Sequence, residues 1–274
     1  MNFTDKLHKA IERNTSLVCL GLDPDLELMP PDTDILSFNK SIVDATSDLV
    51  CAYKPNLAFY EALGLDGLTA LMNTIEHIPE DVPIIGDAKR GDIGNTARLY
   101  AKALFETFGF DATTVNPYLG YDAVEPFLSY RDKGVFLLCR TSNPGASDFQ
   151  SLPCSPSDAS GQEPLFSVVA RKARQWNQHG NVGLVVGATY PEELAQIRMS
   201  CPDMVLLVPG IGAQQGDLAL AVRHGLDAKG EKTIFASSRQ ILYASKDKEF
   251  AQAARQAAEQ LRTEINSLFN SAEP

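Results

Sequence analysis

Short apolar segments that alternate with longer helical patterns constrain the fold of this chain more than any other feature. Residues 82–85 and 205–208 are two such segments, and neither carries a charged side chain. Near-continuous apolar runs of this kind are typical of parallel strands buried on both faces. The expected strands are residues 16–22, 50–54, 82–87, 112–116, 134–140, 182–187, 204–208 and 233–236.

Helical patterns fill the intervals between these segments. The helix at 191–200 has a clear start, because Pro191 is followed by Glu192 and Glu193 near the positive end of the helix dipole. Eight strands that alternate with helices predict a parallel sheet closed into a (β/α)8 barrel, the TIM barrel of the α/β class. The other expected helices are residues 34–49, 67–77, 91–108, 121–130, 164–179 and 216–225.

An open, doubly wound sheet is the alternative architecture. It fits less well, because the first expected strand ends in Gly21-Leu22-Asp23, without the second and third glycines of a dinucleotide-binding motif. The length of 274 residues suits one barrel, and the sequence shows neither a domain boundary nor an internal repeat. We therefore expect a single domain over residues 1–274, with an N-terminal helix and a C-terminal helix at 246–269 on the barrel exterior.

Residues 141–163 interrupt the regular alternation. This segment is rich in Ser, Pro, Gly and Asp, and it is too long for an ordinary connection between a strand and a helix. It follows the C-terminal end of an expected strand, which is where the active sites of barrel enzymes lie. A mobile loop that closes over the substrate is favoured over an insertion without a role.

The charge balance limits the possible partners. The chain has 24 Lys and Arg against 35 Asp and Glu, a net charge of -11. Binding to nucleic acid or to an acidic membrane surface requires clustered cations, so neither is expected. No apolar run approaches the ~20 residues of a membrane helix, and the acidic, amphipathic N-terminus does not resemble a signal peptide. We expect a cytoplasmic protein, and an anionic small-molecule substrate remains possible.

The cysteines and histidines give no sign of a metal site or a disulfide framework. The five cysteines include no C-x-x-C pair, and most read as small buried apolar residues. The four histidines fall in helical patterns without the spacing of metal ligands. We therefore expect no metal site and no disulfide framework. These residues are Cys19, Cys51, Cys139, Cys154, Cys201, His8, His77, His179 and His224.

Charged residues appear abruptly where the strand at 82–87 ends. Asp87 and Lys89 share one face because side chains in a strand alternate, and Asp92 follows at the start of the next helix. Alternating acids and bases shift each other's pKa values and can keep a lysine protonated as a proton donor. The sequence leaves two interpretations open: a catalytic charge array, or a salt-bridge cluster at a strand end.

Two other expected strands also deliver charges to the same rim. Asp23 ends the first strand and Lys54 ends the second. Charges gathered at a barrel mouth repel each other or strain the structure unless a ligand uses them. Together with Asp87 and Lys89, these residues favour the catalytic interpretation.

The last two strands are followed by segments suited to phosphate. Residues 208–217 are rich in glycine, and Ser238 with Arg239 opens a helix after the last strand. Barrels often bind phosphate at these two loops, and a guanidinium matches phosphate geometry. A tight turn and a helix-capping serine are the alternatives at each place taken alone; as neighbours, the two segments favour a phosphate site.

These residues resemble a known family. The string Asp87-Ala-Lys-Arg-Gly-Asp-Ile-Gly-Asn-Thr96 resembles the signature of orotidine 5′-phosphate decarboxylases, in particular their longer bacterial branch, often called type 2. Supporting matches cover nearly the whole chain: Gly21-Leu-Asp-Pro-Asp25, Tyr53-Lys-Pro-Asn56, Val115-Asn-Pro-Tyr118, Arg140-Thr-Ser-Asn-Pro-Gly145, Pro209-Gly-Ile-Gly-Ala-Gln214 and Ser238-Arg239.

The resemblance implies decarboxylation of orotidine 5′-monophosphate to UMP, the last step of pyrimidine nucleotide synthesis, by a homodimer without metal or cofactor. It implies that Lys54, Asp87, Lys89 and Asp92 form the catalytic network. Of the residues it assigns to substrate binding, Asp23 would contact the ribose together with Lys54, and Ser142 would bind the pyrimidine. Asp92, Ile93 and Thr96 would reach into the partner subunit's site. The remaining substrate-binding residues are Asn143, Gln214, between base and phosphate, and Ser238 and Arg239, at the phosphate.

Two other functions stay open on the residues alone. A related barrel lyase acting on a sugar phosphate, of the 3-keto sugar phosphate decarboxylase or hexulose phosphate synthase type, would need an acidic Mg²⁺ site. Lys54 stands where such a site usually has a glutamate, and a cation there opposes metal binding. A non-catalytic nucleotide-binding barrel would have little use for the charge array.

Overall fold

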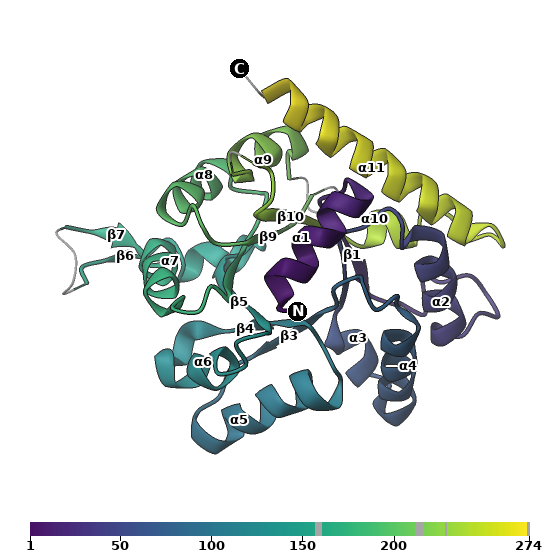
Figure 1. The fold of residues 1–274 in the computed structure, drawn as a ribbon, viewed down its shortest axis with the longest axis horizontal. Coiled ribbons are helices and arrows are strands. Elements are labelled where there is room, and N and C mark those ends of the chain that lie inside the picture. Colours follow the sequence, from purple (N-terminus) through teal and green to yellow (C-terminus); the bar gives the residue numbers. More distant parts are fainter. Residues whose placement is uncertain (157–160, 212–215, 228, 273–274) are drawn as a thin grey trace.

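Eight parallel strands form a barrel in the computed structural model, which describes residues 1–156, 161–211, 216–227 and 229–272 (Figure 1). The hydrogen-bonded order is β2-β1-β10-β9-β8-β5-β4-β3, and bridges from Tyr53 to Ile84 and from Asn56 to Asp87 join the two end strands. The predicted TIM barrel is thereby confirmed. The strands are β1 (Val18–Leu22), β2 (Ala52–Pro55), β3 (Ile85–Arg90), β4 (Ala112–Val115), β5 (Gly134–Arg140), β8 (Val182–Val186), β9 (Leu206–Pro209) and β10 (Thr233–Ser237).

Helices surround the barrel, and their local sequence explains where several begin. The Asp34 side chain accepts from the backbone N–H of Ser37 and caps the helix that follows, and Asp217 caps another in the same way. Among the described residues the helices are α1 (Phe3–Asn14), α2 (Ile35–Thr46), α3 (Leu57–Glu61), α4 (Gly64–His77), α5 (Gly94–Lys102), α6 (Tyr121–Leu128), α7 (Leu165–Trp176), α8 (Pro191–Ser200), α9 (Leu218–Gly225), α10 (Arg239–Leu242) and α11 (Phe250–Ala272).

Most predicted helices are present with shifted ends. The pattern at 91–108 divides into α5 and a π-helical turn at Ala103–Thr107, and α3 has no counterpart in the prediction. The helix expected at 91 begins at Gly94, because the three preceding residues form the turn after β3. Tertiary contacts at the barrel rim therefore decide these boundaries, which periodicity alone does not define.

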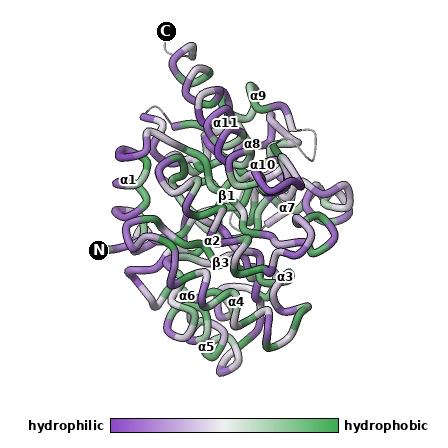
Figure 2. Tube along the Cα trace, turned by 90° about the vertical axis from the view of Figure 1, so that its right-hand side faces the viewer, coloured by the Kyte–Doolittle hydropathy of each residue, from purple (hydrophilic) through white to green (hydrophobic). Residues whose placement is uncertain are grey.

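One end of the barrel is closed by α1. Phe3 and Leu7 are buried against side chains of the barrel interior, and the Phe3 ring meets that of Phe136 edge to face, with centroids 5.7 Å apart. Figure 2 shows the apolar segments gathered in the middle of the molecule and polar turns along the outer faces of α1 and α11. With the N-terminal end of the barrel closed, the C-terminal ends of the strands are left to form a site.

The segment at 141–163 has more regular structure than the sequence suggests. It contains a 3₁₀ turn at Pro144–Asp148 and a short antiparallel pair of strands, β6 (Pro153–Cys154) and β7 (Glu163–Pro164). Figure 1 shows this pair projecting sideways beyond α7. Its base is fixed, since the N–H of Phe166 donates to the carbonyl of Gln150 at 2.9 Å. Closure of this loop over a substrate stays a prediction.

No helix in the described part of the chain is long and apolar enough to cross a membrane.

Candidate active site

Asp87 lies at the centre of a charge cluster at the C-terminal end of β3, in which Asp87 and Lys54 are buried and Lys89 is exposed. Its Oδ2 accepts a hydrogen bond from Lys54 Nζ at 2.8 Å, and its Oδ1 accepts one from Lys89 Nζ at 2.6 Å. A third donor, Thr114 Oγ1, lies 2.8 Å from Oδ1. The structure therefore brings Lys54, from β2, into contact with Asp87, and places Asp87 beside Lys89 on β3.

The two ammonium groups determine the protonation of this cluster. Burial acts to raise the pKa of Asp87, but the positive charges of Lys54 and Lys89 outweigh it and hold the pKa well below the usual range of a carboxyl. Burial likewise acts to lower the pKa of Lys54, and the carboxylates of Asp87 and Asp23 outweigh it and raise the pKa. The lysine–aspartate pair is thus fully charged at neutral pH.

Lys89 reaches the cluster from an unusual backbone conformation. Its φ is 47°, in the left-handed region that costs a non-glycine residue about 1–2 kcal/mol. The pairing of β3 with β4 is also irregular between Gly86 and Arg90. Such conformations persist only where the surrounding structure holds them, and they are common at active sites.

A cavity of about 770 Å³ opens above the cluster. It is large enough for a nucleotide-sized ligand, given that small-molecule sites measure roughly 300–1,000 Å³. Seven of the predicted site residues line it: Asp23, Lys54, Asp87, Lys89, Ser142, Asn143 and Arg239. The charged side chains of four strands therefore converge on one volume, with the base of the long loop on its other side.

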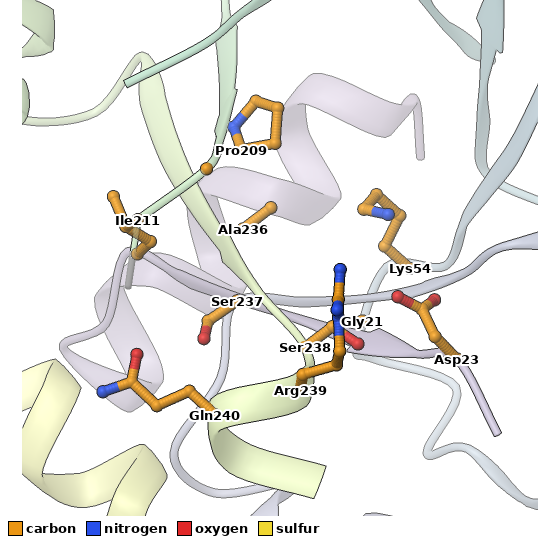
Figure 3. A pocket seen from close by; sticks show the side chains of 11 residues that line it. Gly21, Asp23, Lys54, Pro209, Ile211, Ala236, Ser237, Ser238, Arg239 and Gln240 are labelled. Atoms are coloured by element: carbon orange, nitrogen blue, oxygen red, sulfur yellow. The ribbon is translucent and has the colours of Figure 1, made fainter. Parts of the chain in front are cut away.

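A smaller cavity of about 140 Å³ shares Asp23, Lys54 and Arg239 with the first and extends between β9, β10 and β1 (Figure 3). Its floor is tight, because a Cβ added at Gly21 would lie 2.8 Å from the Cβ of Ser238. Figure 3 shows Arg239 reaching from the start of α10 toward the space beside Lys54. Three side-chain oxygens around this cavity are buried without a partner: Asp23 Oδ1, Ser237 Oγ and Ser238 Oγ. Unpartnered buried hydroxyls beside a guanidinium are suited to an anionic ligand.

Comparison with known proteins agrees with this geometry. Residues 16–254 match the family described as "Orotidine 5'-phosphate decarboxylase / HUMPS family". The chain belongs to this family. A protein of Thermomicrobium roseum named orotidine 5'-phosphate decarboxylase is 53% identical over 274 residues, which cover 98% of this chain and 96% of that protein. A protein of Dehalococcoides mccartyi with the same name is 52% identical over 267 residues, 97% of this chain and 98% of the relative.

A solved structure also matches over its full length. The OMP decarboxylase of Leishmania donovani superposes with a TM-score of 0.86 at 39% identity, covering 98% of this chain and 100% of that one. The resemblance predicted from the sequence motifs is confirmed at the level of the family.

Three residues that the family resemblance assigns to the site lie outside both cavities in the isolated chain. Asp92 accepts a hydrogen bond from the N–H of Ile93 at 2.8 Å, and the side chains of Ile93 and Thr96 are exposed. Lys89 pairs with Asp87 but not with Asp92 in this chain. Because the resemblance assigns Asp92 to the partner subunit's site, the contact between Asp92 and Lys89 stays a prediction. Gln214 lies outside the described residues.

Besides Thr114, two residues of the cavity wall were not predicted from the sequence, Tyr243 and Gln150. The Tyr243 hydroxyl donates to the carbonyl of Asp23 at 2.7 Å and accepts from the N–H of Asp25 at 2.6 Å, which fixes the turn after β1. Gln150 accepts from the N–H of Thr141 at 2.8 Å and so holds the loop that carries Ser142. Tyr243 contacts residues far away in the sequence, and Gln150 lies within an irregular loop, so no periodic pattern indicates either residue.

The cysteines, histidines and acids of this chain form no metal site in the described residues. No group of three or more His, Cys, Asp and Glu there is placed to hold a metal ion. Burial raises the pKa of Cys19, under the charge cluster, to about 12, so its thiol is not a nucleophile at neutral pH.

Proposed function

We propose that this barrel decarboxylates orotidine 5′-monophosphate to UMP and carbon dioxide, as a carboxy-lyase of pyrimidine nucleotide synthesis. Membership of the family supports the reaction class. The single observation that carries the assignment is the Lys54–Asp87–Lys89 cluster, which lies in a nucleotide-sized cavity also lined by Arg239; the adjoining smaller cavity carries the unpartnered hydroxyls of Ser237 and Ser238.

The reaction needs electrostatic help at one carbon. When the bond from C6 to the carboxylate breaks, its electron pair stays on C6 in an orbital that the pyrimidine ring cannot delocalise. Fixed charges stabilise such a transition state better than water, because they need no reorganisation. The Lys89 ammonium stabilises the developing charge and then gives its proton to C6, and it regains a proton from solvent. Asp87 holds Lys89 in place and stands near the departing carboxylate.

The rest of the nucleotide binds along the two cavities in this proposal. Asp23 and Lys54 bind the ribose hydroxyls, and Ser142 binds the pyrimidine with Asn143 beside it. Ser238 and Arg239 bind the phosphate, and the family resemblance assigns Gln214, which lies outside the described residues, to contacts with base and phosphate. The phosphate is remote from C6, so its binding energy serves to order the charged groups rather than to react.

Replacing Arg239 with alanine is expected to weaken UMP binding by about ten- to a hundredfold, the range for losing hydrogen bonds to a charged group. The measurement is calorimetric titration with UMP and with uridine, which lacks the phosphate. Uridine should bind the variant and the wild-type protein equally. Arg223→Ala, an exposed arginine on α9, is the matched control and should bind UMP normally. Unchanged UMP affinity in Arg239→Ala would rule out the phosphate role.

We further propose that the enzyme works as a homodimer with shared sites. Exposed apolar side chains around α5 and in the 3₁₀ turn at Pro117–Leu119 support this proposal; they are Ile93, Leu99, Tyr100, Tyr118 and Leu119. Asp92 and Ile93 directly precede α5 and Thr96 lies in its first turn, and each would complete the partner's site. Besides the second subunit, the proposed partner is the nucleotide substrate; neither nucleic acid nor a membrane is proposed as a partner. The five unpaired cysteines suit the reducing cytoplasm.

A substrate and chelator panel tests the function against its alternative. Loss of absorbance of orotidine 5′-monophosphate that continues in excess EDTA supports the cofactor-free decarboxylase. Turnover confined to a 3-keto sugar phosphate and abolished by EDTA would support the metal-assisted lyase instead. UMP binding without any turnover would support a non-catalytic binder.

A further inference from the structure

We propose that Thr114 is a positioning residue whose hydroxyl holds Lys89 and Asp87 in their reactive arrangement. The inference rests on the proposed decarboxylation and adds to it a residue on a strand that contributes none of the predicted site residues. Two observations support the inference: the irregular backbone of β3 opposite Thr114, and the two hydrogen bonds that the Thr114 hydroxyl makes.

The backbone of β3 bulges opposite Thr114. Gly86 pairs with Thr113 and Arg90 with Val115, so three residues of β3 (87–89) face the single residue Thr114 on β4. The extra length lets the chain turn at Lys89, whose φ of 47° lies in the left-handed region. A bulge of this kind removes regular ladder partners and re-aims a side chain.

The Thr114 hydroxyl replaces the missing ladder partner. Its oxygen accepts the backbone N–H of Lys89 at 2.9 Å, and its own proton goes to Asp87 Oδ1 at 2.8 Å. The same Oδ1 accepts from Lys89 Nζ at 2.6 Å. The Thr114 hydroxyl therefore fixes both the main chain at Lys89 and the Asp87 carboxylate to which the Lys89 ammonium donates. Thr114 is 1% exposed, so bulk water has little access to take over both bonds.

Thr113 provides a matched comparison on the neighbouring position. It is fully buried, and its hydroxyl donates one hydrogen bond to the carbonyl of Gly86 at 2.8 Å. Successive side chains of a strand face opposite sides, so Thr113 points away from the interior face that Thr114 shares with the charge cluster. Loss of either hydroxyl removes buried hydrogen bonding, but only Thr114 touches the cluster.

The test compares Thr114→Val, Thr114→Ala, Thr114→Ser and Thr113→Val in steady-state turnover of orotidine 5′-monophosphate. Valine keeps the shape and removes the hydroxyl, and a small displacement of a reacting group can lower turnover by about a hundredfold. We expect that loss in kcat for Thr114→Val and Thr114→Ala, with KM and UMP affinity within a few-fold of wild type. Thr114→Ser should restore most of kcat. Thr113→Val should also lower the melting temperature, because it loses a buried hydrogen bond, and should keep kcat.

Two results would overturn the inference while leaving the decarboxylation in place: full kcat in folded Thr114→Val or Thr114→Ala, or an equal loss of kcat in Thr113→Val. Failure of Thr114→Ser to recover would also overturn it. If Thr114→Val does not fold, Thr114→Ala and Thr114→Ser decide the matter between them. An inactive wild-type protein in the same assay would instead overturn the proposed function, and this inference with it.

Discussion

Replacing Lys89 with alanine is expected to lower kcat/KM by at least about ten-thousandfold, because one side chain both stabilises the developing charge and delivers the proton. The fold should survive, since the Lys89 side chain is 48% exposed and its loss leaves Asp87 paired with Lys54. The measurement is turnover of orotidine 5′-monophosphate by folded variant, with UMP affinity measured alongside.

Lys9→Ala serves as the control for Lys89→Ala. Lys9 is an exposed lysine on α1, at the opposite end of the barrel, so its loss should leave turnover unchanged. Substantial turnover by Lys89→Ala would contradict the proton-donor role, because the other ammonium that contacts Asp87 in the described part of the chain belongs to the buried Lys54.

Asp92→Ala is expected to be as inactive as Lys89→Ala, and a mixture of the two variants is expected to recover activity. If each site takes Lys89 from one subunit and Asp92 from the other, a mixed dimer carries one intact site and one doubly defective site. Random exchange between equal amounts then restores about a quarter of the wild-type sites, as the two-fold symmetry requires. The measurement is turnover after the variants are mixed, unfolded and refolded together.

The control for this experiment is each variant taken through the same refolding alone. Recovery in the mixture and in neither variant alone supports shared sites. Two outcomes would contradict the proposal: wild-type turnover by Asp92→Ala, or a mixture that stays inactive although subunit exchange is demonstrated by a size-tagged variant. Asp92 is half-buried, and its only hydrogen bond among the described residues is accepted from the N–H of Ile93, which leaves its carboxylate able to contact a partner subunit.

The barrel and half of its site could be predicted from local patterns. Apolar runs marked the strands because parallel strands are buried on both faces. Asp23, Lys54, Asp87 and Lys89 stood out because each puts a charge directly after such a run, and parallel strands deliver their ends to one rim. The structure then gave the distances which show that Lys54, Asp87 and Lys89 form one cluster rather than separate charges.

The remaining features depend on geometry that periodicity does not encode. Thr114 reads as an ordinary strand threonine, and its role follows only from the bulge that brings Lys89 against it. Tyr243 lies 220 residues from Asp23, whose carbonyl it binds, so no local signal could link them. The long loop reads as irregular because its strands, β6 and β7, are two residues each.

The central claim is that the protein replaces the C6 carboxylate of orotidine 5′-monophosphate with a proton from an exchangeable acid and without a metal, and the most direct measurement is the reaction in D2O followed by NMR. The account predicts that orotidine 5′-monophosphate disappears as UMP and carbon dioxide form in equal amounts, with one deuterium at C6 of every UMP, in the presence of EDTA. Unchanged substrate, or UMP that carries no deuterium at C6, would contradict it.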